Sequence, residues 1–164
     1  MNKNKQTDII TTIIDKLREY HHTISFAESC TGGLLVSKFT AISGVSSVLN
    51  GSVVSYSNDI KHRWLGVETN ILEQFGAVSK ECIEQMLYGI KKMANSDYAI
   101  AVSGIAGPTG GTEYKPVGTV YIGLLSPTGL TIHHCFFEGD REAIQNESVD
   151  FAINLLTKEL KIVF

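Results

Sequence analysis

The sequence predicts an α/β fold with three layers, in which helices cover both faces of a mixed, mostly parallel central sheet. Two observations lead to this prediction. Short runs rich in apolar and β-branched residues alternate with longer segments whose apolar residues recur at helical spacing. One run, residues 98–102, is almost unbroken in its apolar character, which is typical of a central strand covered on both faces.

The first part of the chain alternates helix and strand. Isoleucines and a leucine fall on one face of the first segment, with charged residues opposite, which indicates an amphipathic helix. The expected elements are a frayed tail at 1–6, a helix at 7–20, a strand at 23–28, a helix at 32–42 and a strand at 51–56.

Polar capping residues mark the helices that follow. Ser57 or Asn58 is expected to cap a short helix that carries Lys61 and Trp64. Ser79 is expected to cap a longer helix. The buried stripe predicted for that longer helix is Ile83, Met86, Leu87, Ile90 and Met93.

The last part of the chain predicts a hairpin and a final helix. Strands are expected at 117–125 and 130–137, joined by a turn at 126–129 that has proline and glycine at favourable positions. Asp140 is a plausible cap for the last helix, whose apolar face is Ile144, Phe151, Ala152, Leu155 and Leu156.

Length and composition argue against several classes of protein. At 164 residues the chain, 1–164, fits one domain. The net charge of -3 and the lack of a Lys/Arg block argue against a nucleic-acid partner. No apolar run reaches the roughly 20 residues that span a bilayer, so no membrane partner is expected. Three cysteines without CxxC spacing indicate reduced thiols in a cytoplasmic protein and no structural metal site.

A small hydroxyl and two glycines stand where the first strand gives way to a helix, in the sequence AESCTGG at 27–33. Unpaired N–H groups at such a junction can hold an anion or a developing oxyanion. Ser29 is therefore a candidate nucleophile, with N–H groups near Thr31, Gly32 and Gly33 as oxyanion donors. The alternative is that Ser29 or Thr31 only caps the helix.

A serine hydroxyl is a weak nucleophile at neutral pH and needs a base, and the sequence shows no His-Asp pair that could serve as one. Lys61 is the candidate, because burial and the first turn of a helix both lower the pKa of an amine. Tyr56, at the end of the preceding strand, could relay the proton. The alternative is a solvated Lys61, the commoner state of lysine.

Cys30 is a competing nucleophile, because a helix N-terminus favours the thiolate. Its side chain should point opposite to that of Ser29 if the strand continues, and a buried free cysteine is usually inert. Ser29 is therefore preferred over Cys30.

The glycine-rich loop at 103–111 is a candidate phosphate site. Ser103, Gly104 and Gly107 lie in it, and glycines let backbone N–H groups approach a ligand closely. Arg141, in the first turn of the last helix, could clamp the phosphate, and Lys115 ranks lower. The alternatives are a flexible connection for the loop and a surface ion pair with Asp140 or Glu142 for Arg141.

Taken together, these segments resemble the CinA carboxy-terminal domain family, whose characterised members are nicotinamide-nucleotide amidohydrolases. The resemblance covers roughly residues 7–160. Its segments are AESCTGG at 27–33, YSN at 56–58 leading to Lys61, LGV at 65–67, GAVS at 76–79, VSGIAGP at 102–108 with Gly110 and Gly111, KPVGTV at 115–120, and GDR at 139–141.

The resemblance implies deamidation of a small-molecule partner, nicotinamide mononucleotide, to nicotinate mononucleotide and ammonia, without a metal or an organic cofactor. It implies Ser29 as nucleophile, Lys61 as general base, and Tyr56 and Arg141 as supporting residues. It also implies a homodimer. The alternative is a non-catalytic nucleotide sensor or protein-interaction module on the same fold, which would need no activated Ser29.

Overall fold

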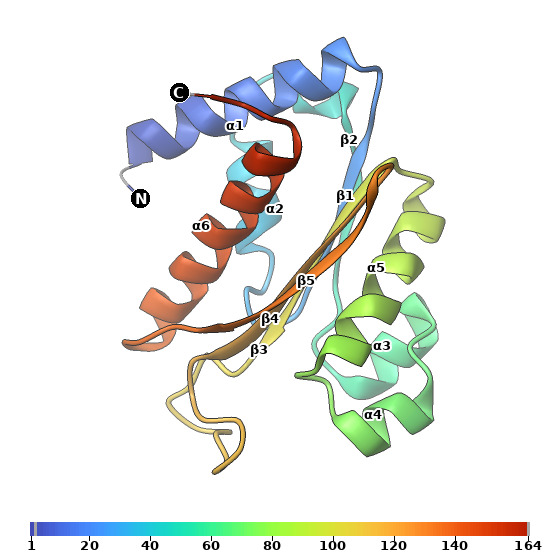
Figure 1. Ribbon diagram of the computed structural model, residues 1–164, viewed down its shortest axis with the longest axis vertical. Coiled ribbons are helices and arrows are strands. Elements are labelled where there is room, and N and C mark those ends of the chain that lie inside the picture. Colours follow the sequence, from blue (N-terminus) through green and yellow to red (C-terminus); the bar gives the residue numbers. More distant parts are fainter. Residues whose placement is uncertain (2, 164) are drawn as a thin grey trace.

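The computed structural model describes Met1 and residues 3–163, and it has the expected three layers around one mixed sheet (Figure 1). The strands lie in the order β2-β1-β3-β4-β5, so β3 is central as expected. β1 pairs in parallel with β2 and β3, whereas β4 is antiparallel to both β3 and β5. The strands are β1 (Ile24–Glu28), β2 (Leu49–Val54), β3 (Tyr98–Gly104), β4 (Thr119–Ser126) and β5 (Gly129–Phe136).

Three helices pack on each face of the sheet, each group over its own apolar core (Figure 1). The first group is α1 (Lys3–Glu19), α2 (Leu34–Thr40) and α6 (Arg141–Glu159). The second group is α3 (Asn58–Leu65), α4 (Thr69–Phe75) and α5 (Lys80–Ala94). Because both faces are covered, every residue of β1 is buried, and Ser29 follows directly at its carboxyl end.

The expected caps are confirmed at three helices. The side chains of Ser57, Ser79 and Asp140 accept hydrogen bonds from the N–H groups of Ile60, Cys82 and Ala143. These caps satisfy N–H groups that have no partner inside a helix. They begin α3, α5 and α6 at the places that the sequence indicates.

Some expectations about the elements are wrong. Residues 3–6 are helical, not a tail, because Gln6 is buried and its Nε2 donates to Asp150 Oδ1 at 2.6 Å; Asn2 lies outside the described residues. α4 was not expected, since none of its side chains is buried and its sequence lacks a strong apolar stripe. Met93 is 53% exposed, beyond the buried stripe of α5.

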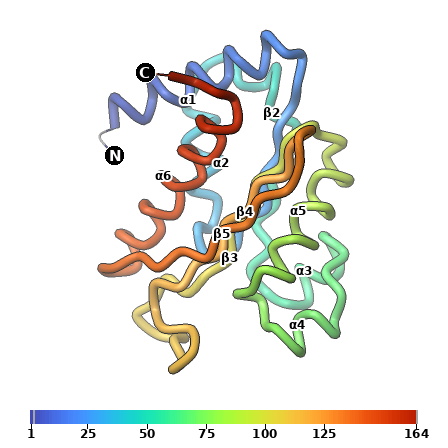
Figure 2. Tube along the Cα trace, viewed as in Figure 1, coloured from blue at the N-terminus to red at the C-terminus, as the bar shows by residue number. Residues whose placement is uncertain are grey.

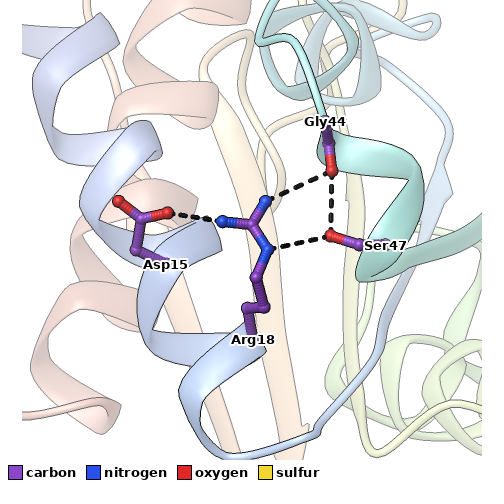
Figure 3. Close-up of polar contacts among 4 residues, drawn as sticks. All are labelled: Asp15, Arg18, Gly44 and Ser47. Atoms are coloured by element: carbon purple, nitrogen blue, oxygen red, sulfur yellow. Dashed lines mark hydrogen bonds and ion pairs between the residues drawn. The ribbon is translucent and has the colours of Figure 1, made fainter.

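An arginine ties the end of α1 to the segment before β2 (Figure 3). Arg18 Nε donates to Ser47 Oγ at 3.2 Å and Nη2 to the Gly44 carbonyl at 3.4 Å, while Nη1 pairs with Asp15 at 2.7 Å. Ser47 ends the short 3-10 helix η1 (Val45–Ser47). These contacts are exposed. They fix the start of the edge strand β2, at the opposite end from the strand ends that carry the candidate site.

The carboxyl ends of the parallel strands gather the candidate site residues. Glu28, the last residue of β1, is in register with Val54 of β2 and Val102 of β3. The segment 105–118, which joins β3 to β4, projects at the end of the molecule away from both chain ends (Figure 2). Ligands of open α/β sheets bind at the carboxyl ends of the strands, where the sequence analysis predicted the site.

We expect Gly89→Ala to destabilise the protein, because α3 crosses α5 at this glycine. A Cβ at Gly89 would lie 2.0 Å from the Leu65 carbonyl oxygen, so the backbone must shift. The strain should outweigh the ~1 kcal/mol helix preference of alanine and lower the free energy of unfolding by about 1–3 kcal/mol. Urea unfolding measures this. Gly51→Ala is the control, since a Cβ there meets nothing within 4 Å; equal stability of both variants would contradict the prediction.

Candidate active site

A serine and a buried lysine meet at the end of β1. Lys61 Nζ lies 3.0 Å from Ser29 Oγ and also donates to the Ser55 carbonyl at 2.7 Å. Lys61 is 1% exposed, and Ser29 is 8% exposed. The alternative of a solvated Lys61 is therefore wrong, and the expected pairing of Ser29 with Lys61 has the geometry of a nucleophile and its base.

The electrostatic surroundings of Lys61 favour a neutral amine. Burial lowers the pKa of Lys61 from its ordinary value of 10.5, because the interior does not solvate an ammonium. Among the described residues the ion pairs do not include Lys61, and its acceptors are a hydroxyl and main-chain carbonyls. An uncharged amine is the form that can accept the proton of Ser29.

Cys30 lines the same pocket, but its thiol is not the nucleophile that the geometry favours. Burial raises the pKa of Cys30 to about 12, so the thiol stays protonated near neutral pH. The lysine amine also contacts the oxygen of Ser29 and not the sulfur. These observations support the preference for Ser29 over Cys30.

The N-terminus of α2 is capped by the side chain of a buried glutamate, which the sequence analysis missed. Glu28 accepts hydrogen bonds from the N–H groups of Gly33, Leu35 and Val36 at 3.1, 3.1 and 2.8 Å. The Thr31 hydroxyl donates to the same carboxylate at 2.6 Å. Neither Ser29 nor Thr31 is therefore the cap. A glutamate two positions before a Cys-Thr-Gly-Gly turn was the available signal.

The expected oxyanion donors need a correction. Gly32 N–H donates to the Ser29 carbonyl at 3.0 Å and Gly33 N–H to Glu28, so neither is free for a substrate. Among residues 30–33 only Cys30 lines the pocket, and the N–H group of Thr31 follows it directly in the chain. Within the described part of the chain, no acceptor takes the N–H groups of Cys30 and Thr31. These two N–H groups come directly after the candidate nucleophile in the sequence and have no partner in that part of the chain that would keep them from a ligand.

The pocket beside Ser29 has a volume of about 250 Å³ and is formed by segments far apart in the sequence. Its walls come from the ends of β1 and β3, the start of α3, the segment before α5, the loop after β3 and the start of α6. The lining residues are Ser29, Cys30, Tyr56, Lys61, Ala77, Val78, Ser103, Gly104, Ile105, Ala106, Gly107, Thr109, Gly110 and Arg141.

The glycine-rich loop lies on this pocket, as expected, but its residues act in different ways. The Ser103 hydroxyl donates to the Ala77 carbonyl at 2.8 Å and so holds the wall of the pocket. A Cβ at Gly104 would lie 2.8 Å from the Thr119 carbonyl oxygen, so this glycine serves the packing of β4. By contrast, Ala106, Gly107, Thr109 and Gly110 line the pocket, and their N–H groups find no acceptor among the residues described.

Arg141 and Tyr56 both line the pocket and are joined by a hydrogen bond. Arg141 Nη1 donates to the Gly107 carbonyl at 2.7 Å, and Nη2 donates to the Tyr56 hydroxyl at 2.6 Å. No ion pair of Arg141 is found in residues 1 and 3–163, so the alternative of a surface pair with Asp140 or Glu142 is wrong. No carboxylate of the described chain therefore competes with an anionic group of a ligand for the guanidinium.

The proton relay expected of Tyr56 is not supported by this geometry. β2 ends at Val54, so Tyr56 lies beyond the strand, 59% exposed. Its hydroxyl faces Arg141, and only its carbonyl oxygen reaches the amine of Lys61, at 3.5 Å. Lys115 lies off the pocket, with its amine bonded to the Phe75 carbonyl at 2.6 Å.

Residues 1 and 3–163 contain no group of three or more His, Cys, Asp or Glu side chains placed to hold a metal ion. No helix in that part of the chain is both long enough and apolar enough to cross a membrane.

Comparison with known proteins decides the family, because the CinA C-terminal domain matches residues 6–160. The chain belongs to the CinA C-terminal domain family. A CinA-like protein of Fervidobacterium nodosum is 50% identical over 146 residues, which are 89% of this chain and 36% of that protein. A CinA-like protein of Thermotoga neapolitana is 43% identical over 161 residues, 98% of this chain and 38% of that protein.

Solved structures agree with this assignment. The competence/damage inducible protein CihA from Agrobacterium tumefaciens is 35% identical, with a TM-score of 0.91 over 98% of this CinA domain and 97% of that chain. A CinA superfamily protein from Escherichia coli is 27% identical, with a TM-score of 0.92 over 97% and 92% of the two chains. The domain spans a little over a third of the length of the CinA-like relatives named above.

Proposed function

We propose that this CinA domain is a serine amidohydrolase that deamidates nicotinamide mononucleotide to nicotinate mononucleotide and ammonia. The observation that carries the proposal is the buried contact of 3.0 Å between Lys61 Nζ and Ser29 Oγ. The substrate is taken from the family resemblance of the site segments. The proposal also includes a homodimer and catalysis without a metal or an organic cofactor.

The first half of the reaction acylates the serine. Ser29 Oγ attacks the carboxamide carbon while neutral Lys61 takes the hydroxyl proton, and the N–H groups of Cys30 and Thr31 hold the oxyanion. The carbon–nitrogen bond then breaks. Lys61 returns its proton to the departing nitrogen, which leaves as ammonia, and the nicotinoyl group stays on Ser29 as an ester.

The second half releases the acid. A water molecule gives a proton to Lys61 and attacks the ester carbon, again with the oxyanion held by the two N–H groups. The bond between the carbon and Ser29 Oγ breaks, and Lys61 returns the proton to that oxygen. The products are the free serine and the carboxylic acid, and Lys61 is again neutral.

The charges around the pocket suit a phosphorylated pyridinium substrate. Arg141 and the N–H groups of the loop at 106–110 offer hydrogen bonds to a phosphate. Lys61 and Arg141 are the basic side chains that line the pocket within the described chain. Because burial lowers the pKa of Lys61 and favours its neutral form, a positively charged ring meets little repulsion near Ser29. The positive ring in turn makes the carboxamide carbon more electrophilic.

Replacing either member of the pair should abolish turnover. We expect Ser29→Ala and Lys61→Met each to lower ammonia release from nicotinamide mononucleotide by at least about 1,000-fold, because nucleophile and base act as a unit. The matched control is Lys91→Met, which removes a half-buried lysine that bonds main-chain carbonyls far from the pocket. Folded wild type that releases no ammonia would favour the non-catalytic nucleotide sensor instead.

The rate should rise with pH and level off above the pKa of Lys61. Only the neutral amine accepts the serine proton, and burial places that pKa below 10.5. Stability follows the same sign: charging Lys61 costs free energy in the folded state, so wild type gains stability as pH rises from the folded pKa towards 10.5. Lys61→Met should lack this gain in urea unfolding. A kcat/KM that does not rise with pH at any pH below 10.5 at which the protein stays folded would contradict the role of Lys61.

Arg141 should recognise the phosphate and not the amide. We expect Arg141→Ala to raise KM for nicotinamide mononucleotide by about tenfold or more, the usual effect of losing a hydrogen bond between charged groups. The kcat/KM for nicotinamide riboside, which lacks the phosphate, should change far less. Arg63→Ala, which removes an exposed arginine of α3 paired with Asp59, is the control. An equal loss on both substrates would assign Arg141 to another task.

A further inference from the structure

We propose that Gln145 is a positioning residue that holds the oxyanion-binding turn after Ser29. The inference rests on the proposed amidohydrolase chemistry and adds a residue that the site segments do not contain. Gln145 lies on α6, and its Nε2 donates to the Cys30 carbonyl at 2.8 Å across 115 residues of sequence. The side chain does not line the pocket, so it acts through the turn and not on the substrate.

Three successive carbonyls of the turn, those of Ser29, Cys30 and Thr31, are each held by a donor. The Ser29 carbonyl accepts from Gly32 N–H at 3.0 Å, and the Thr31 carbonyl accepts from Leu34 N–H at 2.9 Å. Both of these are main-chain contacts within five residues. The Cys30 carbonyl between them depends on Gln145. One side chain from a distant helix therefore completes the set of contacts that fixes the turn.

Holding this carbonyl also sets the direction of an N–H group. In a trans peptide the carbonyl and the following N–H point in opposite directions, so a donor on the Cys30 carbonyl orients the N–H of Thr31. The same hydrogen bond limits rotation of the main chain at Cys30 and so also restrains the direction of the Cys30 N–H group. A hydrogen bond on the carbonyl additionally polarises the peptide and strengthens its N–H as a donor. The N–H groups of Cys30 and Thr31 both find no acceptor in the described chain.

The position of Gln145 on α6 links it to the other side of the pocket. Arg141 lies four residues earlier, so the two side chains share one face of the helix. Arg141 holds the loop after β3 through the Gly107 carbonyl, and Gln145 holds the turn after β1 through the Cys30 carbonyl. One turn of α6 thus sets the spacing between the candidate phosphate site and the oxyanion donors.

The test compares Gln145→Met with Gln85→Met. Methionine keeps the length of the side chain and removes the donor. Gln85 is a matched control, because it is a half-buried glutamine on α5 whose single main-chain contact, to Glu68 N–H, lies away from the pocket. We expect Gln145→Met to lower kcat by about 10- to 100-fold, less than the ~10²–10³ typical of deleting an oxyanion donor. KM and the melting temperature should stay near those of the control.

A second measurement does not depend on the natural substrate. A fluorophosphonate forms a bond between phosphorus and Ser29 Oγ, fluoride leaves, and Lys61 takes the proton, so its rate reports the serine and its oxyanion donors. Intact mass gives that rate. We expect labelling of Gln145→Met to be about tenfold slower than that of Gln85→Met. Gln145→Glu, which sets a carboxylate against the carbonyl, should be slower still.

The outcomes separate the two proposals. Labelling of wild type at Ser29 without ammonia release from nicotinamide mononucleotide would overturn the proposed substrate, while the labelling rates would still decide on Gln145. Equal kcat and equal labelling of Gln145→Met and Gln85→Met would overturn the positioning role. A loss of thermal stability in Gln145→Met with unchanged kcat would assign the residue to structure alone. Wild type that neither labels nor turns over would overturn both proposals.

Discussion

The burial of the Lys61 amine beside the Ser29 hydroxyl is the contact on which the rest of the site depends. A lysine taken out of water without a carboxylate partner loses its preference for the charged form. A helix cap and a glycine at a helix crossing bring the lysine to this buried position. Ser57 begins α3, and Gly89 lets α3 approach α5 closely, so that the amine reaches main-chain carbonyls at the ends of the strands. The result is an amine that can act as a base.

Glu28 shows why the lysine stays unpaired although a buried carboxylate precedes Ser29. Successive side chains of a strand point to opposite faces, so Glu28 turns away from the side on which Ser29 meets Lys61. Its charge is met by three N–H groups at the start of α2 and by the Thr31 hydroxyl. The helix N-terminus favours that negative charge. Glu28 and the amine that contacts the next residue, Ser29, therefore do not form an ion pair within the described chain.

The pocket is assembled by side chains that reach across the molecule. Arg141 and Gln145 tie the start of α6 to the loop after β3 and to the turn after β1. Ser103 ties the end of β3 to the segment before α5. Since these contacts use main-chain carbonyls, they fix backbone positions while leaving nearby N–H groups for a ligand. The electrostatic character of the pocket follows from this division between held carbonyls and open N–H groups.

The sequence by itself determined the fold class, the order of the strands along the chain and most helix caps, because apolar periodicity and capping chemistry are local. It also named Ser29 and Lys61 as a pair, from the chemistry of a serine that needs a base. It named Gly32 and Gly33 as N–H donors to a substrate, although both N–H groups have partners within the protein, and it gave Tyr56 a relay role, although the Tyr56 hydroxyl contacts Arg141. Only the tertiary structure decided those points, together with the strand order in the sheet and the contacts of Glu28 and Gln145. The physical reason is that the direction of a hydrogen bond between distant segments depends on packing, which no local pattern of residues records.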